Sequence, residues 1–264
     1  MIRAVILAAG RGSRMGQLTG ERPKCLIELA GCPLLVRQIA ALRRGGAERI
    51  GIVRGYRAEA IAAAAAGATL EYFDNPRWAE TNMVASLAAA AAWLRSGPVI
   101  VSYGDIFYRA SLVRALAALP GPLAVAYDRL WRRLWTSRFA RPLSDAETFR
   151  RDGAGHLLEI GGPPARLEEI EGQYMGLLHF TPPAWRIVEE LLARLTAPAR
   201  DRLDLTGLLR RLLAARALPV ATCPGDGQWG EVDQPSDIEL YERMLRDGEL
   251  ELEPPLSASE EVAV

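Results

Sequence analysis

Residues 2–15 read IRAVILAAGRGSRM, and a Pro-Lys pair follows at residues 23–24. The apolar first half of this stretch predicts a buried strand, and the glycine-rich second half predicts a loop that leaves the carboxyl end of that strand. The two glycines allow a sharp turn in which successive backbone N–H groups point at one anion. Arg14 and Lys24 add fixed positive charge beside that cradle. Together these features predict a site for a nucleoside triphosphate.

Two better-known glycine patterns do not fit this loop. A dinucleotide-binding loop, G-x-G-x-x-G, needs a glycine where Met15 stands and an acidic residue at the end of the second strand. The second strand is predicted at residues 49–53, and Arg54 and Gly55 follow it. The phosphate loop G-x-x-x-x-G-K-[ST] does not occur in the sequence. Another kind of phosphate-binding α/β protein stays open as an alternative.

Strand-like and helix-like segments alternate through the first half of the chain. This order predicts an α/β fold with a doubly wound, mostly parallel, Rossmann-like sheet, whose functional sites lie at the carboxyl ends of the strands. The predicted strands are residues 49–53, 69–73, 98–103 and 218–222, and the predicted helices are residues 33–42, 58–66, 83–94, 184–195, 204–215 and a last helix from Pro235.

The second half of the chain begins with a region that lacks the regular alternation of strands and helices. Short extended segments and glycine-rich turns fill residues 126–180, which we interpret as a small lobe that binds the second substrate. We expect residues 1–246 to form a single domain that includes this lobe. Residues 247–264 carry six acidic residues and no basic ones, so we predict an acidic, disordered tail.

The composition limits the possible functions. Half of the 264 residues are hydrophobic, and 32 basic residues balance 32 acidic ones, which argues against a nucleic-acid partner. The three cysteines lack C-x-x-C spacing and predict free thiols in a reducing compartment. We find no signal peptide, and the alanine-rich stretches are too short to cross a membrane. We therefore expect a cytoplasmic protein with no membrane partner, and its oligomeric state is left open.

The glycine loop, the arginine after it and the Pro-Lys pair together resemble the nucleotidyltransferases that make NDP-sugars and CDP-alcohols. The resemblance implies that an acceptor phosphate or phosphonate attacks the α-phosphorus of the triphosphate and that pyrophosphate leaves. The acceptor oxygen is already ionised, so catalysis rests on charge neutralisation and positioning rather than on a strong general base. Mg²⁺ is therefore the expected cofactor.

Two aspartates suit such a metal ion. Asp105 follows the predicted strand at residues 98–103, and Asp233 lies in the sequence WGEVD at residues 229–233. The resemblance implies that aspartates at these two places share the metal. The alternative for each is that it only caps a helix or forms a turn.

The cations and the nucleotide-binding residues follow from the same resemblance. We expect Lys24 to bridge the α-phosphate and the acceptor's anion, and Arg14 to bind the β- and γ-phosphates; the alternative for each is a solvated surface cation. Asn82 and Ser86 share one face of a helix start that meets the base and ribose in related enzymes, although Thr81 or Asn82 could serve only as the helix cap. The predicted nucleotide-binding residues are Leu7, Ala8, Ala9, Gly10, Gly12, Ser13, Asn82 and Ser86.

Further segments narrow the resemblance to one subgroup, which covers about residues 1–246. This subgroup contains the bacterial phosphocholine cytidylyltransferases and the cytidylyltransferases of phosphonates such as 2-aminoethylphosphonate. Hexose-1-phosphate enzymes usually carry Pro-Leu-Thr after the arginine, and only Leu18 and Thr19 match it here. The segments that look like the subgroup are residues 23–28, 74–76, 81–86, 142–150 and 171–176.

Aromatic residues near the lobe suggest an amine on the acceptor. An ammonium group gains about 0.5–2 kcal/mol from each aromatic face. Glu231 would share a face with Asp233 in an extended segment. The alternative is that the aromatic side chains only pack the lobe, and Arg132 and Arg133 leave an acidic acceptor possible. The predicted acceptor-binding residues are Trp131, Trp135, Tyr174, Trp229 and Glu231, with Asp145 and Glu147 as added counter-charges.

The sequence therefore predicts a Mg²⁺-dependent cytidylyltransferase. It would transfer CMP from CTP to a small phosphorylated alcohol or phosphonate, of the phosphocholine or 2-aminoethylphosphonate type, and release pyrophosphate. One alternative is a hexose-1-phosphate nucleotidyltransferase that uses UTP or dTTP. Another is a catalytically idle, nucleotide-binding regulatory subunit. The joint presence of Lys24, Asp105 and Asp233 argues against the idle subunit.

Overall fold

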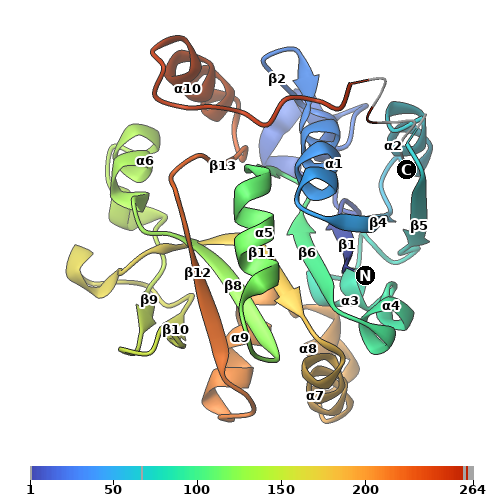
Figure 1. The fold of residues 1–264 in the computed structure, drawn as a ribbon, viewed down its shortest axis with the longest axis vertical. Helices are drawn as coiled ribbons and strands as arrows, with labels where there is room; N and C mark the ends of the chain where they lie inside the picture. Colours follow the sequence, from blue (N-terminus) through green and yellow to red (C-terminus); the bar gives the residue numbers. More distant parts are fainter. Residues whose placement is uncertain (1, 67, 258–259, 261–264) are drawn as a thin grey trace.

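The computed structural model describes residues 2–66, 68–257 and 260. In this part of the chain, a central seven-stranded sheet has the strand order β12-β8-β11-β6-β1-β4-β5 (Figure 1). β11 is antiparallel to its neighbours β6 and β8, and the remaining pairs are parallel, as the sequence predicted. The strands of this sheet are β1 (Ile2–Leu7), β4 (Ala47–Arg54), β5 (Leu70–Asp74), β6 (Val99–Tyr103), β8 (Leu123–Asp128), β11 (Gln173–Phe180) and β12 (Val220–Gly225).

Helices cover both faces of the sheet (Figure 1). Along β1, Ala4 and Ile6 pack into one core together with α1 and α5, and Val5 and Leu7 pack into the other together with α3, α4, α7 and α9. Burial on both faces explains the continuous apolar run of this strand. The helices are α1 (Leu34–Arg44), α2 (Ala58–Ala64), α3 (Met83–Ala88), α4 (Ala91–Ser96), α5 (Ala110–Ala118), α6 (Trp131–Arg138), α7 (Pro182–Ala193), α8 (Ala197–Asp201), α9 (Leu205–Ala214) and α10 (Pro235–Arg246).

Three short antiparallel pairs complete the fold. Two of them, β2 with β3 and β9 with β10, join neighbours in the sequence. The third pairs β7 with β13, which lie far apart in the chain. The residues are β2 (Glu28–Leu29), β3 (Cys32–Pro33), β7 (Ile106–Phe107), β9 (Phe149–Arg151), β10 (Leu157–Ile160) and β13 (Gly230–Glu231). Every helix in the described residues is too short or too polar to span a lipid bilayer.

Two predicted segments differ in the structure. The single helix predicted over residues 83–94 is two helices, because the chain turns at Ala89–Ala90 and buries Ala90 in the core. Alanine's helix preference gives no warning of such a tertiary contact. Residues 174–180, predicted as part of the lobe, belong to β11, an interior strand of the sheet between β8 and β6. The lobe is therefore the excursion between β8 and β11, which contains α6, β9 and β10.

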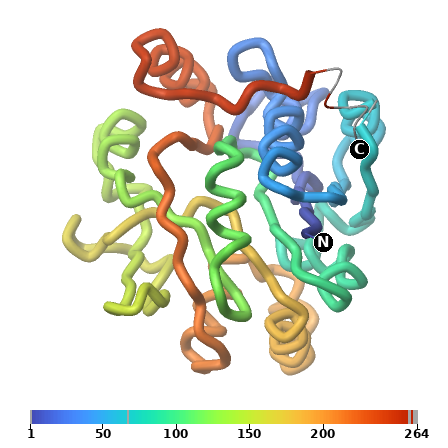
Figure 2. Tube along the Cα trace, in the orientation of Figure 1, coloured from blue at the N-terminus to red at the C-terminus, as the bar shows by residue number. Residues whose placement is uncertain are grey.

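The acidic tail also differs from its prediction. Figure 2 shows the chain leaving α10 and running beside α1. Leu250 is 2% exposed, and the Glu253 carbonyl accepts a hydrogen bond from Arg37 Nη1 at 3.1 Å. We predicted disorder from the composition, but Leu250 and Glu253 are buried, because arginines on other elements bind the Glu253 carboxylate and its backbone carbonyl. Residues 258–259 and 261–264 lie outside the described residues.

Glu253 should stabilise the fold from within this tail. Its Oε1 lies 3.0 Å from Arg44 Nη1, and its Oε2 accepts the Ala110 N–H at the start of α5 at 2.8 Å. Glu253→Gln removes the charge from both contacts of a buried group, so we expect the free energy of unfolding in urea to fall by about 1–3 kcal/mol. The exposed Glu251 carboxylate, paired with Arg109, is the matched control. Glu251→Gln should cost no more than about 0.5 kcal/mol, and equal losses in the two variants would contradict a buried role for Glu253.

Candidate active site

A cavity of about 310 Å³ opens at the carboxyl ends of β1 and β6. All eight residues predicted to bind the nucleotide line it, and so do Arg14, Lys24 and Asp105. The structure thus gathers into one cavity the glycine loop, the start of α3 and one predicted metal ligand. Five further residues that the sequence did not assign to the nucleotide also line it, which are Cys25, Trp78, Thr81, Met83 and Gly104.

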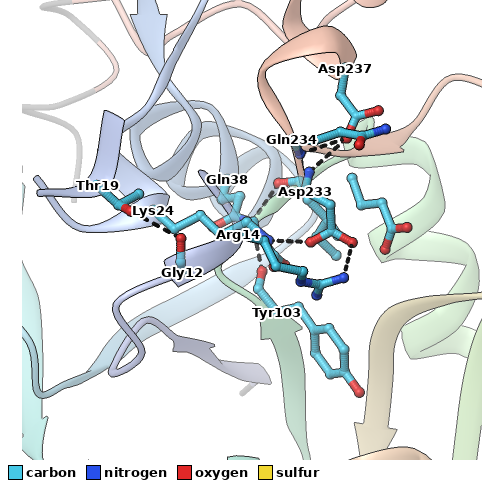
Figure 3. Close-up of polar contacts among 12 residues, drawn as sticks. Gly12, Arg14, Thr19, Lys24, Gln38, Tyr103, Asp233, Gln234 and Asp237 are labelled. Carbon is cyan, nitrogen blue, oxygen red and sulfur yellow. Dashed lines mark hydrogen bonds and ion pairs between the residues drawn. The ribbon is translucent and has the colours of Figure 1, made fainter. Parts of the chain in front are cut away.

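The glycine loop holds its shape through a left-handed residue and a buried threonine. Gly12 has a φ of +74°, in the region that side chains rarely adopt. Thr19, fully buried, donates a hydrogen bond to the Gly12 carbonyl at 3.0 Å and to the Gly16 carbonyl at 3.3 Å (Figure 3). A Cβ at Gly12 would lie 2.6 Å from Cβ of Lys24. The loop therefore sits directly against the lysine side chain.

This close approach makes Gly12→Ala a sensitive test. The new methyl group must displace the Lys24 side chain and strain the backbone, so we expect kcat to fall by about 10- to 100-fold. Gly20→Ala is the matched control, because the backbone of Gly20 has right-handed helical angles that alanine adopts readily. A Cβ there would meet only the Gln17 carbonyl oxygen, at 3.4 Å. The control should keep kcat within about twofold. A Gly12→Ala enzyme with unchanged kcat would show that the position of Lys24 is not critical.

Lys24 joins the two predicted metal carboxylates. Its Nζ donates a hydrogen bond to Asp105 Oδ2 at 2.6 Å and a second to Asp233 Oδ1. Its side chain is 10% exposed, and it is the only lysine in the sequence. Burial lowers the pKa of the Lys24 ammonium, but attraction by Asp105 and then Asp233 more than offsets this, so its pKa lies above the ordinary value. Lys24 is therefore a fixed, compact positive charge between two carboxylates.

Pairing of β7 with β13 brings the two aspartates together. Asp105 lies just before β7 and Asp233 just after β13, and the Val232 N–H donates to the Asp105 carbonyl at 2.9 Å. Gln38, a residue that the sequence did not single out, stabilises this turn with two hydrogen bonds. Its Nε2 donates to the Tyr103 carbonyl at 2.7 Å and to the Ile106 carbonyl at 2.5 Å. A polar residue next to Arg37, among the apolar residues of the predicted helix, was the only sequence signal for it.

Arg14 and Glu231 lie on either side of Asp233. The Arg14 guanidinium is 72% exposed and lies 3.1 Å from Asp233 Oδ2 (Figure 3). Burial raises the pKa of the Asp233 carboxyl, but Lys24 and then Arg14 lower it below its ordinary value. Glu231 is ion-paired with Arg138 at 2.7 Å, and burial raises its pKa to about 7 against the attraction of that arginine. Glu231 therefore contacts an arginine of the lobe.

The start of α3 is both a capped helix end and part of the cavity wall. Asn82 caps the helix by accepting the Met83 N–H at 2.8 Å, and it also lines the cavity. Ser86 lines the cavity as well and accepts a hydrogen bond from Asn75 Nδ2 at 3.0 Å. Trp78 closes the same side, with its ring 5.3 Å from that of Tyr56. The cap and the cavity wall are thus one structure.

The predicted aromatic acceptor site differs in the structure. Trp131, Trp135 and Trp229 are only 2–3% exposed. The ring of Trp135 lies 6.3 Å from that of Trp131 and 6.2 Å from that of Trp229, so these side chains pack α6 against the segment before β13. Tyr174 is half-buried and meets Tyr103 edge to face at 5.8 Å. The tryptophans build the lobe, and a dissolved acceptor cannot reach their faces.

Two carboxylates of the lobe, Asp145 and Glu147, have charged groups as neighbours. Loss of solvation raises the pKa of the Asp145 carboxyl, and the charges of Arg138, Asp233 and Arg14 also act on it. Loss of solvation likewise raises the pKa of Glu147, whose neighbouring charges include Asp204 and Asp145. Asp145 is therefore within electrostatic range of Asp233, and Glu147 is within range of Asp145.

The donor set limits the metal that this site could hold. In the described residues, no group of three or more acidic, histidine or cysteine side chains is arranged to bind a metal on its own. Asp105 and Asp233 nevertheless both reach the Lys24 ammonium, so one ion could contact both carboxylates. Mg²⁺ is commonly held by one or two carboxylates together with substrate phosphates and water. The two aspartates fit that kind of ion.

The family of MobA-like NTP transferase domains matches residues 4–216. This match covers most of the chain, and the chain belongs to that family. It is therefore a nucleotidyltransferase, as the sequence predicted.

Individual relatives agree with the predicted subgroup. The CTP:phosphoglutamine cytidylyltransferase of Campylobacter jejuni is 32% identical over 258 residues, which is 90% of this chain and 98% of that protein. The CMP-5'-(3-aminopropyl)phosphonate synthase of Streptomyces rubellomurinus is 30% identical over 89% of this chain, which spans 37% of that longer protein. The structure of the CTP:phosphocholine cytidylyltransferase of Streptococcus pneumoniae has a TM-score of 0.69 at 21% identity, covering 92% of this chain and 99% of that one, and shows a shared fold. The predicted resemblance to cytidylyltransferases is confirmed.

Proposed function

We propose that this protein is a Mg²⁺-dependent cytidylyltransferase that transfers CMP from CTP to a small phosphorylated or phosphonate acceptor and releases pyrophosphate. The observation that carries the proposal is the Lys24 ammonium held between Asp105 and Asp233 at the edge of the glycine-loop cavity. The free state of all three cysteines supports a cytoplasmic setting.

The charges of the site residues determine which part of the substrates each would bind. The glycine loop presents backbone N–H groups to the triphosphate. Lys24 draws the α-phosphate and the acceptor's anion together, and Arg14, exposed at the cavity rim, binds the outer phosphates. When bound, Mg²⁺ held by Asp105 and Asp233 would neutralise charge on the phosphate oxygens. The acceptor oxygen is already ionised, so these residues supply position and positive charge rather than a general base.

The choice of CTP rests on the relatives, several of which are named for reactions with CTP or for CMP products. Ala8 and Ala9 line the cavity, and a base that is recognised by backbone groups there leaves no signal in the side chains. A hexose-1-phosphate enzyme shares the fold, as a solved thymidylyltransferase-like structure with a TM-score of 0.73 at 16% identity shows. The nucleotide and the acceptor must therefore be tested together.

We propose an amine on the acceptor, of the phosphocholine or 2-aminoethylphosphonate type. The anionic end would meet Lys24 and Arg14, and the ammonium end would meet Asp145 and Glu147. Two relatives are named for amine-bearing compounds, phosphoglutamine and aminopropylphosphonate. The two carboxylates of the lobe and the names of these two relatives support an amine-bearing acceptor.

Pyrophosphate release tests the proposal directly. CTP, UTP, dTTP, ATP and GTP would be paired with phosphocholine, 2-aminoethylphosphonate, phosphoglutamine and glucose-1-phosphate, with and without Mg²⁺. We expect turnover only with CTP, an amine-bearing acceptor and Mg²⁺. Asp145→Asn should raise KM for that acceptor by about tenfold while KM for CTP stays within about twofold. Turnover with a sugar phosphate would overturn the acceptor class, and CTP binding without turnover on any acceptor would favour an idle nucleotide-binding subunit.

A further inference from the structure

Arg138 is a buried cation that belongs to the lobe. It is the last residue of α6, and its side chain is 0% exposed. Its guanidinium lies over the rings of Trp135 and Phe139, at 5.2 Å and 5.0 Å from their centres. A cation without contact with water is tolerated only when carboxylates satisfy it. The carboxylates that pair with Arg138 therefore identify the segment whose position it fixes.

Both partners come from the segment that carries Asp233. Nε and Nη2 of Arg138 contact the two carboxylate oxygens of Asp237 at 3.0 Å and 3.1 Å, and Nη1 contacts Glu231 at 2.7 Å. The Asp237 contact is bidentate, which fixes direction as well as distance. Arg138 thus contacts this segment at residues that precede and follow Asp233.

Asp237 connects Arg138 to the backbone of Asp233. Its Oδ2 accepts the Asp233 N–H at 2.8 Å and the Gln234 N–H at 3.0 Å (Figure 3). Asp237 is 1% exposed, so little water competes for these bonds. A continuous set of contacts therefore runs from the Arg138 guanidinium through the Asp237 carboxylate to the backbone of the residue whose side chain meets Lys24.

We propose that Arg138 is a positioning residue for the transfer reaction. Through Asp237 it sets the backbone at Asp233, so the packing of the acceptor lobe fixes where the Asp233 carboxylate stands relative to Asp105 and Lys24. The inference rests on the proposed function for its effect on kcat, while the geometry it predicts at Lys24 can be observed without turnover.

The test compares Arg138→Gln and Asp237→Asn with Arg37→Gln. Arg37 is the matched control because it is also a buried arginine, and it donates to backbone carbonyls of Leu29, Ala30 and Glu253 away from the site. Kinetics with CTP and Mg²⁺ would be measured alongside thermal unfolding. Because Lys24 is the only lysine, ¹³C-lysine labelling gives one set of side-chain NMR signals that reports on this position in each glutamine or asparagine variant.

We expect Arg138→Gln and Asp237→Asn to lower kcat by about 10- to 100-fold, with KM for CTP within about threefold, and to shift the Lys24 Cε signal. Arg37→Gln should lose comparable thermal stability yet keep kcat within about threefold and leave the Lys24 signal unchanged. Arg138→Lys should recover part of the loss in kcat. If Arg138→Gln does not fold, Asp237→Asn and Arg138→Lys decide the question.

Two results would overturn the inference. Folded Arg138 and Asp237 variants with wild-type kcat and an unmoved Lys24 signal would show that the network is not needed for positioning. An Arg37→Gln enzyme that is equally impaired would show a general effect of losing a buried arginine. A wild-type enzyme that turns over none of the acceptors would defeat the proposed function instead, and the Lys24 signal would still decide the positioning role.

Discussion

Asp105→Asn and Asp233→Asn should each lower kcat by on the order of a thousandfold, about 4 kcal/mol of transition-state stabilisation. Asparagine keeps the shape of the side chain and removes its charge, so the variants test charge alone. Both carboxylates reach the same ammonium, and the site offers a metal no third acidic ligand among the described residues. Pyrophosphate release at saturating CTP, measured over a range of Mg²⁺, should also show a higher Mg²⁺ requirement in both variants.

A matched control separates this effect from the cost of any buried aspartate. Asp128 ends β8 much as Asp105 follows β6, and it is 1% exposed. Its carboxylate accepts the Leu130 N–H at 2.8 Å. Asp128→Asn should keep kcat within about threefold while it changes the melting temperature. If Asp105→Asn and Asp233→Asn retain more than a tenth of wild-type kcat, their assignment to the metal must be abandoned.

Lys24→Met should lower kcat by on the order of a hundredfold to a thousandfold, with a change of less than about fivefold in KM for CTP. The ammonium is placed where negative charge from two substrates must meet, so its loss should be felt mainly in the transition state. The variant also leaves Asp105 and Asp233 facing each other without their shared cation. We therefore expect the free energy of unfolding to fall by about 1–3 kcal/mol, since both carboxylates are only partly exposed.

Arg22→Met serves as the control for Lys24→Met. Arg22 lies in the same loop, but its side chain is 53% exposed and its partner is Glu28 at 3.6 Å. Its replacement should leave kcat within about twofold. Lys24→Arg restores charge but spreads it over a planar group that is too large for the gap between two carboxylates, so it should recover only part of the loss. A Lys24→Met enzyme with normal kcat and a much higher KM for CTP would assign the lysine to ground-state binding.

Local features of the sequence were enough for the parallel sheet and for the nucleotide cavity. The glycine loop and the strand before it are contiguous, and parallel strands end at one edge of a sheet, so Gly12, Asn82 and Asp105 could be expected to meet. A helix cap at Thr81 or Asn82 was an alternative that the sequence left open, and the structure shows that Asn82 is the cap. The resemblance supplied the pairing of Asp105 with Asp233 and the assignment of Asn82 and Ser86 to the nucleotide.

The acceptor side could not be predicted in the same way. The presence of three tryptophans in the sequence does not show whether their rings are exposed or buried. The contact between α6 and the segment before β13 buries them. The tail, read alone, is acidic and without partners, yet on α1 Arg44 pairs with the Glu253 carboxylate and Arg37 donates to the Glu253 carbonyl. In both places the deciding partner lies far away in the chain.

The sequence by itself determined the strand-and-loop cradle, the parallel order of the sheet and the residue types of the catalytic centre, because each depends on neighbours in the chain. The tertiary structure alone decided that β7 pairs with β13, that Lys24 lies between two carboxylates, and that Arg138 of the lobe holds the segment that carries Asp233. Burial and ion pairing are properties of surroundings assembled from distant segments, so they exist only once the chain has folded.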